Sequence, residues 1–316
     1  GLGPTPICYY ALENRDLDGA ITITGSHNPP EYNGIKLSLC GEAVYGDRIK
    51  EVGRIAAAGD WTDGQGVVRE INIYDEYCAR LAADCKISSG KNSLKIAWDT
   101  GNGAAGVVLK NLTDRLPGEH ILMFEDVDGQ FPNHHPDPQV EENLEDLKRV
   151  VREQSCDFGV AFDGDGDRIG VVDKEGRIIW GDQLIALYAR EIAEVINRPL
   201  VILDVKCSQV VSKMINKWGG EPLIWKTGHS LVKAKMKETD AALGGELSGH
   251  ICFNDQFYGH DDGLYCAVRL MNIVDRYGDL GSLLDLFPDT FATPEVRLEV
   301  PESRKFAIID AIKNHL

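Results

Sequence analysis

The sequence predicts several consecutive α/β domains in which helices cover mainly parallel sheets. Two observations lead to this prediction. The chain has 316 residues, which is more than one ordinary hydrophobic core accommodates. Apolar runs of strand length also alternate with segments of helical periodicity along the chain, and this alternation is typical of βα units.

Strands are expected where apolar and β-branched residues follow one another over a few positions. These runs cover 20–24, 35–39, 94–98, 121–124, 158–162, 169–172, 200–205 and 223–225. Helices are expected where apolar residues recur with helical spacing. These segments cover 48–58, 74–84, 141–154, 183–196, 209–218 and 264–277. Asn33-Gly34 is a hairpin-turn signal, so Lys36 is expected at the start of the strand that follows it.

Three positions have the character of domain boundaries. The register of apolar residues changes near 72–74 and again near 177–182, and Pro288 and Pro294 bracket an expected linker at 289–294. The chain starts at Gly1 without a methionine and ends in an apparent helix from Glu302, after a strand-like run at 295–300. One strand and one helix cannot bury their apolar faces against each other alone. We therefore expect an internal portion of a longer protein, truncated at both ends.

Composition and charge exclude several classes of protein. Apolar residues make up 43% of the chain and charged residues 26%, which is typical of a soluble globular protein. The net charge of −17 argues against nucleic-acid binding, and an anionic substrate would need a local cationic pocket. No apolar run approaches the ~20 residues of a membrane span, and no signal peptide is visible. The eight cysteines are scattered without a Cys-x-x-Cys motif, which predicts reduced thiols in a cytoplasmic protein.

The segment Thr24-Gly-Ser-His-Asn-Pro-Pro30 offers one hydroxyl, that of Ser26, in a turn-forming context. The simplest interpretation is a polar turn, because Gly, Ser, Asn and Pro are common turn residues. His27 and Lys36 favour catalysis instead, because a serine that carries a phosphoryl group needs cations or proton carriers nearby.

The segment Asp163-Gly-Asp-Gly-Asp-Arg168 presents three carboxylates at alternate positions, a pattern that binds hard divalent cations through oxygen. A calcium-binding helix–loop–helix would need glycine at the sixth position and glutamate at the twelfth, where this chain has Arg168 and Lys174. Its flanks also have the character of strands. A purely structural acidic turn stays open, although like charges crowded together repel. All-oxygen ligation favours Mg²⁺ or Mn²⁺ over zinc.

The segment Gly101-Asn-Gly-Ala-Ala-Gly106 matches the Gly-x-Gly-x-x-Gly pattern of dinucleotide-binding domains, and Glu125 and Asp126 follow about 20 residues later. An NAD-dependent oxidoreductase is therefore the alternative from another class. Asp99 and Thr100 stand between the apolar strand and the first glycine, which puts an acid where a pyrophosphate would arrive. A tight structural turn from strand to helix explains the glycines better.

Three more segments end or follow expected strands, where open α/β sheets bind ligands. Asp204-Val-Lys-Cys207 contributes Lys206. Thr227-Gly-His-Ser230 contributes His229, and Gly244-Gly-Glu-Leu-Ser-Gly-His250 contributes Glu246, Ser248 and His250. These loops can offer hydrogen bonds to sugar hydroxyls. Either histidine alone would more often be structural.

These motifs, in this order and over essentially the whole chain, resemble those of the α-D-phosphohexomutases, with bacterial phosphomannomutase/phosphoglucomutase enzymes the most similar. The resemblance implies four domains around a central cleft, of which this chain would hold part of domain 1 (residues 1–73, with the phosphoserine loop), domain 2 (74–177, with the metal-binding loop), domain 3 (178–290, with the sugar-binding loop) and the start of domain 4 (291–316). The loop of domain 4 that clamps the substrate phosphate lies outside these residues. Activity is therefore expected of a longer parent protein.

The resemblance also implies a reaction and a site. Hexose 1-phosphate and hexose 6-phosphate of mannose or glucose would interconvert through a phosphoserine and a bisphosphorylated sugar of the glucose 1,6-bisphosphate type. Ser26 would be the phosphoserine and a Mg²⁺ ligand together with Asp163, Asp165 and Asp167. Lys36 would be the general base, Arg168 a catalytic cation, and His27 and His250 further catalytic residues. Lys206, His229, Glu246 and Ser248 would bind the sugar phosphate.

The resemblance leaves the sugar open. Leu247 in the sugar loop resembles dual-specificity members, whereas glucosamine-specific relatives tend to have glutamine there. A phosphoglucosamine mutase is therefore the nearest alternative, and a monomer is not distinguished from a dimer.

Overall fold

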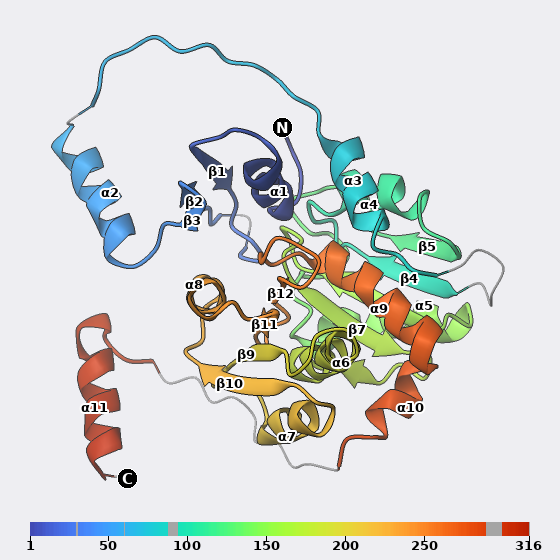
Figure 1. The fold of residues 1–316 in the computed structure, drawn as a ribbon. Helices are drawn as coiled ribbons and strands as arrows, with labels where there is room; N and C mark the ends of the chain where they lie inside the picture. The colour runs from blue at the N-terminus through green and yellow to red at the C-terminus, as the bar shows by residue number, and fades with distance from the viewer. Residues whose placement is uncertain (30, 60, 88–93, 289–298, 316) are drawn as a thin grey trace.

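The computed structural model describes residues 1–29, 31–59, 61–87, 94–288 and 299–315, and its helices and strands are mixed along the chain (Figure 1). The expected linker at 289–294 lies outside the described residues, and so does most of the expected run at 295–300. The strands form three separate sheets of three, five and four strands. The expected mixed α/β architecture is confirmed.

The first unit holds a small antiparallel sheet. Helix α1 (Pro6–Asn14) precedes strands β1 (Gly19–Ile23), β2 (Ile35–Leu39) and β3 (Glu42–Ala43), and helix α2 (Asp47–Ala58) follows them. The expected hairpin turn at Asn33-Gly34 is wrong, because a long loop joins β1 to β2. The two-residue turn is Cys40-Gly41, where both residues have positive φ. Lys36 does lie near the start of β2, as expected.

The second unit holds a five-stranded sheet in the order β5-β4-β6-β7-β8. Its elements are α3 (Tyr74–Ala82), β4 (Lys95–Asp99), α4 (Gly106–Thr113), β5 (Glu119–Met123), η1 (Glu141–Leu144), α5 (Glu145–Glu153), β6 (Phe158–Phe162), β7 (Ile169–Asp173) and β8 (Ile178–Ile179). Strands β5, β4 and β6 run parallel, whereas β7 and β8 return as antiparallel hairpins. Every residue of β6 and β7 is buried, and apart from Asp173 both strands consist of apolar residues and glycine.

The third unit holds a four-stranded sheet in the order β10-β9-β11-β12. Its elements are α6 (Gly181–Ala193), β9 (Leu200–Asp204), α7 (Gln209–Lys217), β10 (Glu221–Trp225), α8 (His229–Thr239), β11 (Leu243–Gly245), β12 (Ile251–Phe253), α9 (Gly263–Tyr277) and α10 (Leu280–Leu284). Strands β10, β9 and β11 are parallel and β12 is antiparallel. Residues 302–315 form η2 (Glu302–Arg304) and α11 (Lys305–His315), which lies apart from the sheets in Figure 1.

The expectation of mainly parallel sheets is therefore only partly correct. Parallel pairing is found on one side of the second sheet (β5, β4 and β6) and one side of the third (β10, β9 and β11), and the first sheet is wholly antiparallel. Short apolar runs do not distinguish a hairpin from a βα crossover in this chain, because the antiparallel strand β7 is buried on both faces, as a parallel strand would be. The expected helix at 141–154 also differs, since its first turn is the 3₁₀ helix η1.

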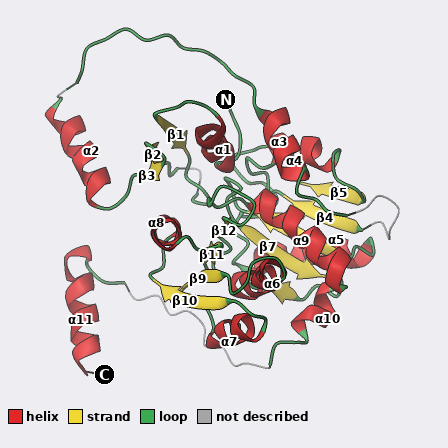
Figure 2. Ribbon diagram, viewed as in Figure 1, coloured by secondary structure: helices red, strands yellow, loops and turns green. Residues whose placement is uncertain are grey.

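Helix α9 connects the second and third units. It packs against β6 and β7 on one side, and against α6 and α3 on the others. Twelve of its residues, from Gly263 to Val274, are buried, and they join the two sheets in one hydrophobic core. Figure 2 shows this helix lying across the five-stranded sheet. The loops at the ends of the strands in the two sheets are therefore held in fixed positions relative to each other.

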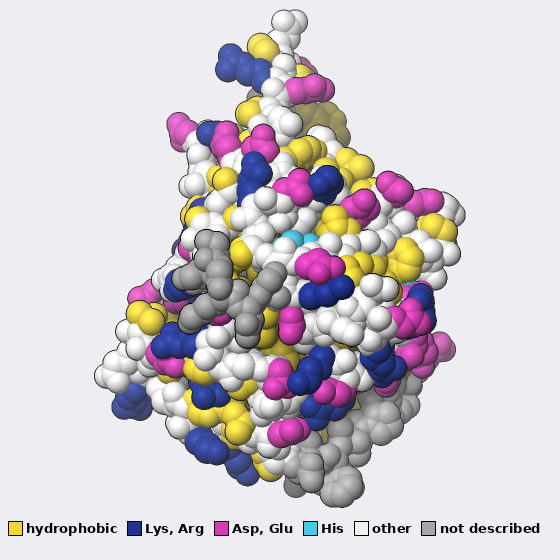
Figure 3. Space-filling model, turned by 90° about the vertical axis from the view of Figure 1, so that its right-hand side faces the viewer, with side chains coloured by type: hydrophobic (Ala, Val, Ile, Leu, Met, Phe, Trp, Pro, Cys, Tyr) yellow, Lys and Arg dark blue, Asp and Glu magenta, His cyan; other side chains and the backbone are white. Residues whose placement is uncertain are grey.

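None of the described helices is both long enough and apolar enough to cross a bilayer. On the face shown in Figure 3, acidic and basic side chains are interspersed and form no continuous basic field.

Helix α9 depends on a buried guanidinium. Arg269 is 1% exposed and lies 2.7 Å from Glu191 and 2.9 Å from Asp255. Replacement by methionine leaves two buried carboxylates without their cation, so we expect Arg269→Met to lower the free energy of unfolding by about 3–5 kcal/mol in urea titrations. Arg149→Met is the matched control. Arg149 forms exposed ion pairs on α5, and its loss should cost at most about 1 kcal/mol. Equal losses in the two variants would contradict this assignment.

Candidate active site

Two loops from different units meet at one point. The backbone around Gly164, in the loop between β6 and β7, lies so near Ser26 that a Cβ on Gly164 would come within 2.2 Å of the Ser26 carbonyl oxygen. Ser26 has a φ of 53°, an unusual conformation for a non-glycine residue. Its Oγ donates a hydrogen bond of 2.8 Å to Asp163 Oδ2 and lies 3.1 Å from His27 Nδ1. Residues 137 positions apart in the sequence are thus in direct contact.

The three aspartates of the β6–β7 loop converge. Asp163, Asp165 and Asp167 are all buried, and one oxygen atom from each lies within 4.8 Å of the others. Asp165 Oδ2 accepts hydrogen bonds from Thr5 Oγ1 and Lys36 Nζ, both at 2.7 Å. The second oxygens of Asp165 and Asp167 are buried and have no hydrogen-bond partner among the described residues. Converging carboxylates with unused oxygens fit a hard divalent cation such as Mg²⁺.

Two side chains provide positive charge for these aspartates. Lys36 Nζ lies 2.7 Å from Asp165 and 2.6 Å from Asp167. Arg168 donates from Nε to Asp163 at 3.1 Å and from Nη1 to Asp137 at the same distance. The positive charges of Lys36 and Arg168 are fewer than the carboxylates of the three aspartates and Asp137. The cluster therefore keeps a net negative charge, which is consistent with a bound cation.

The surroundings shift the pKa values of the cationic groups in opposite directions. Burial opposes the charge of Lys36, but Asp167 and Asp165 raise the pKa of its ammonium well above the usual value. Burial lowers the pKa of His27, and the charge of Arg168 lowers it further. Lys36 is therefore a firmly protonated counter-ion in this arrangement, whereas the neutral form of His27 is favoured.

The expected sugar-side histidines lie next to the aspartates. His229, at the start of α8, and His250, before β12, have stacked rings with centroids 4.9 Å apart. His250 Nδ1 lies 3.5 Å from Asp167 Oδ1 and 3.0 Å from Asp261 Oδ2. His229 Nδ1 lies 2.8 Å from the same oxygen of Asp261. The structure therefore brings both histidines to the aspartate cluster.

Glu246 and Ser248 belong to a hydrogen-bonded junction of loops. Glu246 is 3% exposed, accepts the backbone N–H of Gly228 at one oxygen, and accepts Ser248 Oγ at 3.3 Å at the other. These contacts fix the turn before His229. Lys206 is exposed in the turn after β9.

The glycine-rich segment 101–106 has the structural role expected of it. The backbone N–H of Ala104 donates to the Gly164 carbonyl at 2.8 Å, and a Cβ on Gly103 would lie 2.9 Å from the same oxygen. Helix α4 begins at Gly106, where a Cβ would come within 2.0 Å of the Glu125 carbonyl. These glycines let the backbones of three loops approach closely, and Asp99 accepts Gly101 N–H at 2.8 Å.

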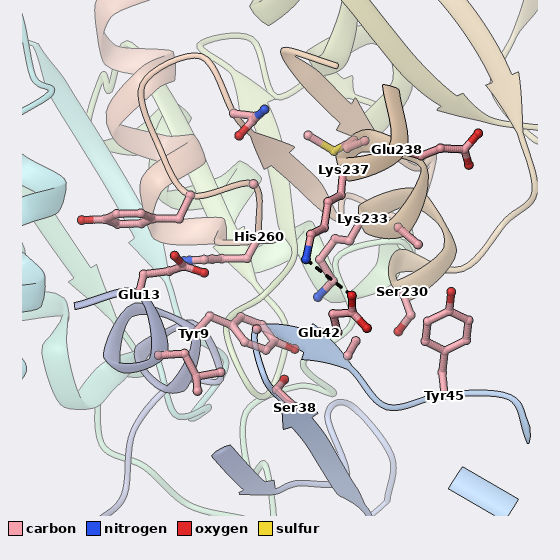
Figure 4. Close-up of a pocket in the computed structure, with 18 of the residues that line it drawn as sticks. Tyr9, Glu13, Ser38, Glu42, Tyr45, Ser230, Lys233, Lys237, Glu238 and His260 are labelled. Carbon is pink, nitrogen blue, oxygen red and sulfur yellow. Dashed lines mark ion pairs between the residues drawn. The ribbon is translucent and has the colours of Figure 1, made fainter. Parts of the chain in front are cut away.

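A cavity of about 1020 Å³ lies beside the aspartate cluster, between the first and third units. Figure 4 shows Lys233 and Lys237 of α8 facing Tyr9 of α1, Ser38 of β2 and Glu42 of β3. Neither Ser26 nor the aspartates line it. Ser38 and Lys36 are two positions apart on β2 and therefore share one face of the strand. The cavity thus adjoins the cluster without containing it.

Sequence reasoning missed four residues that support the site. Thr5 fixes Asp165, Asp137 holds Arg168, Asp204 accepts Thr227 Oγ1 at 2.8 Å, and Asp261 joins the two histidines. Asp204 could have been found, because it ends the buried strand β9 and begins the segment Asp204-Val-Lys-Cys207, in which only Lys206 was assigned a role. Thr5 and Asp261 lie outside any recognisable motif.

Comparison with known families covers most of the chain. Three family models match in order: phosphoglucomutase/phosphomannomutase alpha/beta/alpha domain I at residues 1–62, domain II at 75–176 and domain III at 180–291.

Curated relatives match along nearly the entire sequence. The chain is 43% identical over 99% of its length to a phosphomannomutase/phosphoglucomutase of Pseudomonas putida, and 41% identical to one of Pseudomonas aeruginosa. It is 40% identical to a phosphoglucomutase of Neisseria meningitidis. The chain spans 67% of the length of both Pseudomonas proteins.

Solved structures agree. A phosphoglucomutase/phosphomannomutase family protein from Burkholderia thailandensis matches with a TM-score of 0.87 and 43% identity, over 92% of this chain and 65% of that one. A Paramecium phosphoglucomutase, parafusin, matches with a TM-score of 0.72 at 18% identity, over 90% of this chain and 60% of that one; this match supports the fold alone.

The contact between Gly164 and Ser26 leads to a steric prediction. Gly164→Ala would push the two loops apart, because the new methyl group cannot occupy the space of the Ser26 carbonyl. We expect Mn²⁺ affinity, measured by calorimetry, to fall at least about tenfold. Gly129→Ala is the control, since a Cβ there meets nothing within 4 Å. Unchanged Mn²⁺ affinity in Gly164→Ala would refute the idea that this close approach matters.

Proposed function

The chain belongs to the α-D-phosphohexomutase family of isomerases, and from that premise we propose that it interconverts the 1- and 6-phosphates of mannose or glucose. The proposed route passes through a phosphoserine at Ser26 and a bisphosphorylated hexose. The observation that best supports it is the hydrogen bond from Ser26 Oγ to Asp163, which joins the hydroxyl to the aspartate cluster.

In the proposed cycle, a hydroxyl of the hexose phosphate attacks the phosphorus of phosphorylated Ser26. The Oγ–P bond breaks, a new O–P bond forms on the sugar, the hydroxyl proton passes to a base, and Oγ regains a proton. The bisphosphorylated sugar then turns over and returns its other phosphoryl group to Ser26. This is phosphoryl transfer in which positioning and charge stabilisation supply most of the catalysis.

Charge compensation is the main task of the surrounding residues. A phosphoserine carries about −2 at neutral pH, so with three aspartates the site approaches about −5. We propose that Ser26, Asp163, Asp165 and Asp167 hold Mg²⁺, which would supply charge neutralisation at the phosphoryl oxygens. Arg168, between Asp163 and Asp137, would provide a fixed cation at the same place.

Lys36 suits charge compensation better than proton abstraction. A general base must be neutral, and the contacts of Lys36 with Asp165 and Asp167 hold its pKa above the usual range. Its expected role as base therefore requires that these ion pairs be released first. His27 and His250 are the proposed alternatives, because imidazoles titrate near neutral pH.

The remaining assignments are proposals on the same basis. His229, Glu246 and Ser248 lie together on the loops of the third unit and would receive the sugar, with Lys206 at the turn after β9. We divide the chain into domain 1 (1–73), domain 2 (74–177), domain 3 (178–290) and the start of domain 4 (291–316). A cytosolic location is supported by eight free cysteines.

The choice of sugar is open to direct test. Relatives named phosphomannomutase/phosphoglucomutase favour mannose and glucose phosphates over glucosamine phosphate. A coupled assay on mannose 1-phosphate, glucose 1-phosphate and glucosamine 1-phosphate should give the highest kcat/KM for one of the first two. A clear preference for glucosamine 1-phosphate would instead establish the alternative mutase.

Ser26 itself provides the decisive experiment. After incubation with glucose 1,6-bisphosphate, intact-mass measurement should find one phosphoryl group on the protein and none on Ser26→Ala. Mutase turnover should fall at least about 100-fold in this variant. Ser155→Ala is the control, because Ser155 is exposed and also has a positive φ, 54° against 53° for Ser26. Phosphorylation that persists in Ser26→Ala would end the proposal.

Removal of metal tests the aspartate cluster. EDTA should abolish phosphoryl transfer and Mg²⁺ should restore it, because the carboxylates otherwise repel the phosphoserine. NAD and NADH should have no effect on turnover. A change in nicotinamide absorbance with any hexose substrate would favour the oxidoreductase alternative.

A further inference from the structure

Asp261 is a buried carboxylate that none of the sequence motifs includes. It is 0% exposed and lies just before α9. Lys233 Nζ donates to its Oδ1 at 2.7 Å, and His229 Nδ1 lies 2.8 Å from its Oδ2. His250 Nδ1 lies 3.0 Å from that same Oδ2. One carboxylate therefore faces three nitrogen groups, two of which belong to the stacked histidines.

The chemistry of these partners determines which nitrogen of His229 carries hydrogen. An ionised carboxylate only accepts hydrogen bonds, so His229 Nδ1 must donate. This leaves Nε2 of His229 for another partner. A buried carboxylate that accepts a hydrogen bond from one ring nitrogen sets the tautomer and the orientation of an imidazole. Stacking at 4.9 Å couples the His229 ring to that of His250.

We propose that Asp261 is a positioning residue that fixes the tautomer and ring orientation of His229 through a hydrogen bond, and that its charge and the ring stacking hold His250 beside it, toward the hexose phosphate. This inference rests on the proposed mutase function, in which both histidines lie beside the sugar. Asp261 itself need not touch substrate, because it acts through the two imidazoles.

Lys233 keeps Asp261 ionised. Burial alone would raise the pKa of this carboxyl, but Lys233 and His229 hold it well below its usual value. Lys233 also lies 4.3 Å over the ring of Tyr9 on α1. The support for the histidines therefore extends from the third unit to the first, along the wall of the cavity in Figure 4.

Asp261, the two histidines and Asp167 also have the spacing of a metal site, which would be separate from the site of the three aspartates. Ligand atoms of Asp167, His229, His250 and Asp261 lie within 4.8 Å of one another. Each carboxylate, however, already has an ammonium nearby, Lys36 at 2.6 Å from Asp167 and Lys233 at 2.7 Å from Asp261. Another cation would be repelled by both lysines, so the geometry supports positioning of the histidines instead.

Asp261→Asn tests the proposal by enzyme kinetics. An amide of the same size has one accepting oxygen, so it cannot accept from Lys233 on one side and from His229 on the other. We expect kcat for glucose 1-phosphate to fall about 100-fold, with KM changed by less than about threefold. An unchanged kcat would overturn the proposal.

The neighbouring Asp262→Asn is the matched control. Asp262 is 1% exposed and caps α9, accepting Tyr265 N–H at 2.9 Å and Tyr77 Oη at 2.8 Å, and it contacts neither histidine. It should lose stability but keep kcat within about threefold. An equal loss of kcat in both variants would mean that Asp261 has only a structural role.

A nitrogen NMR measurement does not depend on activity or on the folding of any Asp261 variant. In the unmodified 316-residue chain, the ¹⁵N shift of His229 should show hydrogen on Nδ1. The signal of His229 is identified by its absence in the His229→Gln variant. If that signal shows hydrogen on Nε2 alone, the positioning role is refuted, whether or not the protein is a mutase. If the NMR result is as expected and Ser26 takes up no phosphoryl group, the mutase proposal fails separately.

Coupling between the variants provides a last check. If Asp261 acts through His229, then Asp261→Asn should cost much less in a His229→Gln background than in the wild type. Fully additive losses of kcat would overturn the proposal.

Discussion

The carboxylate of Asp163 joins the parts of this molecule that carry its chemistry. It is fully buried and accepts four hydrogen bonds, from Ser26 Oγ, from the backbone N–H groups of Asp167 and Arg168, and from Arg168 Nε. A buried charge is tolerated only when its lone pairs are satisfied in this way. One group therefore holds the β6–β7 loop with its three aspartates, the loop that carries Ser26, and the Arg168 guanidinium, which agrees with the close approach at Gly164.

Cationic side chains partly compensate the carboxylates of the site, although the whole chain is strongly acidic. Against a net charge of −17, the described site has Arg168 beside Asp163, Lys36 between Asp165 and Asp167, and Lys233 beside Asp261. Each pair is largely shielded from water, so salt screens it less than a surface pair. An anionic sugar phosphate would thus meet fixed cations despite the repulsion of the global field, and the proposed Mg²⁺ would supply the charge that these side chains leave uncompensated.

The three units share this site because their cores are continuous. Helix α9 packs on the five-stranded sheet and on α6 of the third unit, and the residue before its N-cap is Asp261, so the position of the histidines depends on the core beneath them. On the other side, Thr5 of the first unit donates to Asp165, and Tyr9 lies against Lys233. Rigid elements on three sides hold the side chains more accurately than loops alone could. Relatives of the same family match across all three units, which is consistent with a site built jointly.

The sequence alone predicted the mixed α/β architecture, most of the helices and strands, and the two loops that carry Ser26 and the three aspartates, because periodicity and turn chemistry act over a few residues. It misplaced the hairpin turn at Asn33-Gly34, overestimated the parallel pairing, and gave no signal for Thr5 or Asp261. The roles of Thr5 and Asp261 depend on contacts over long separations, 160 residues between Thr5 and Asp165 and 32 between His229 and Asp261. Only the packing of the three units decides which distant polar group arrives at a buried carboxylate, since a short stretch of sequence does not record what will lie across from it.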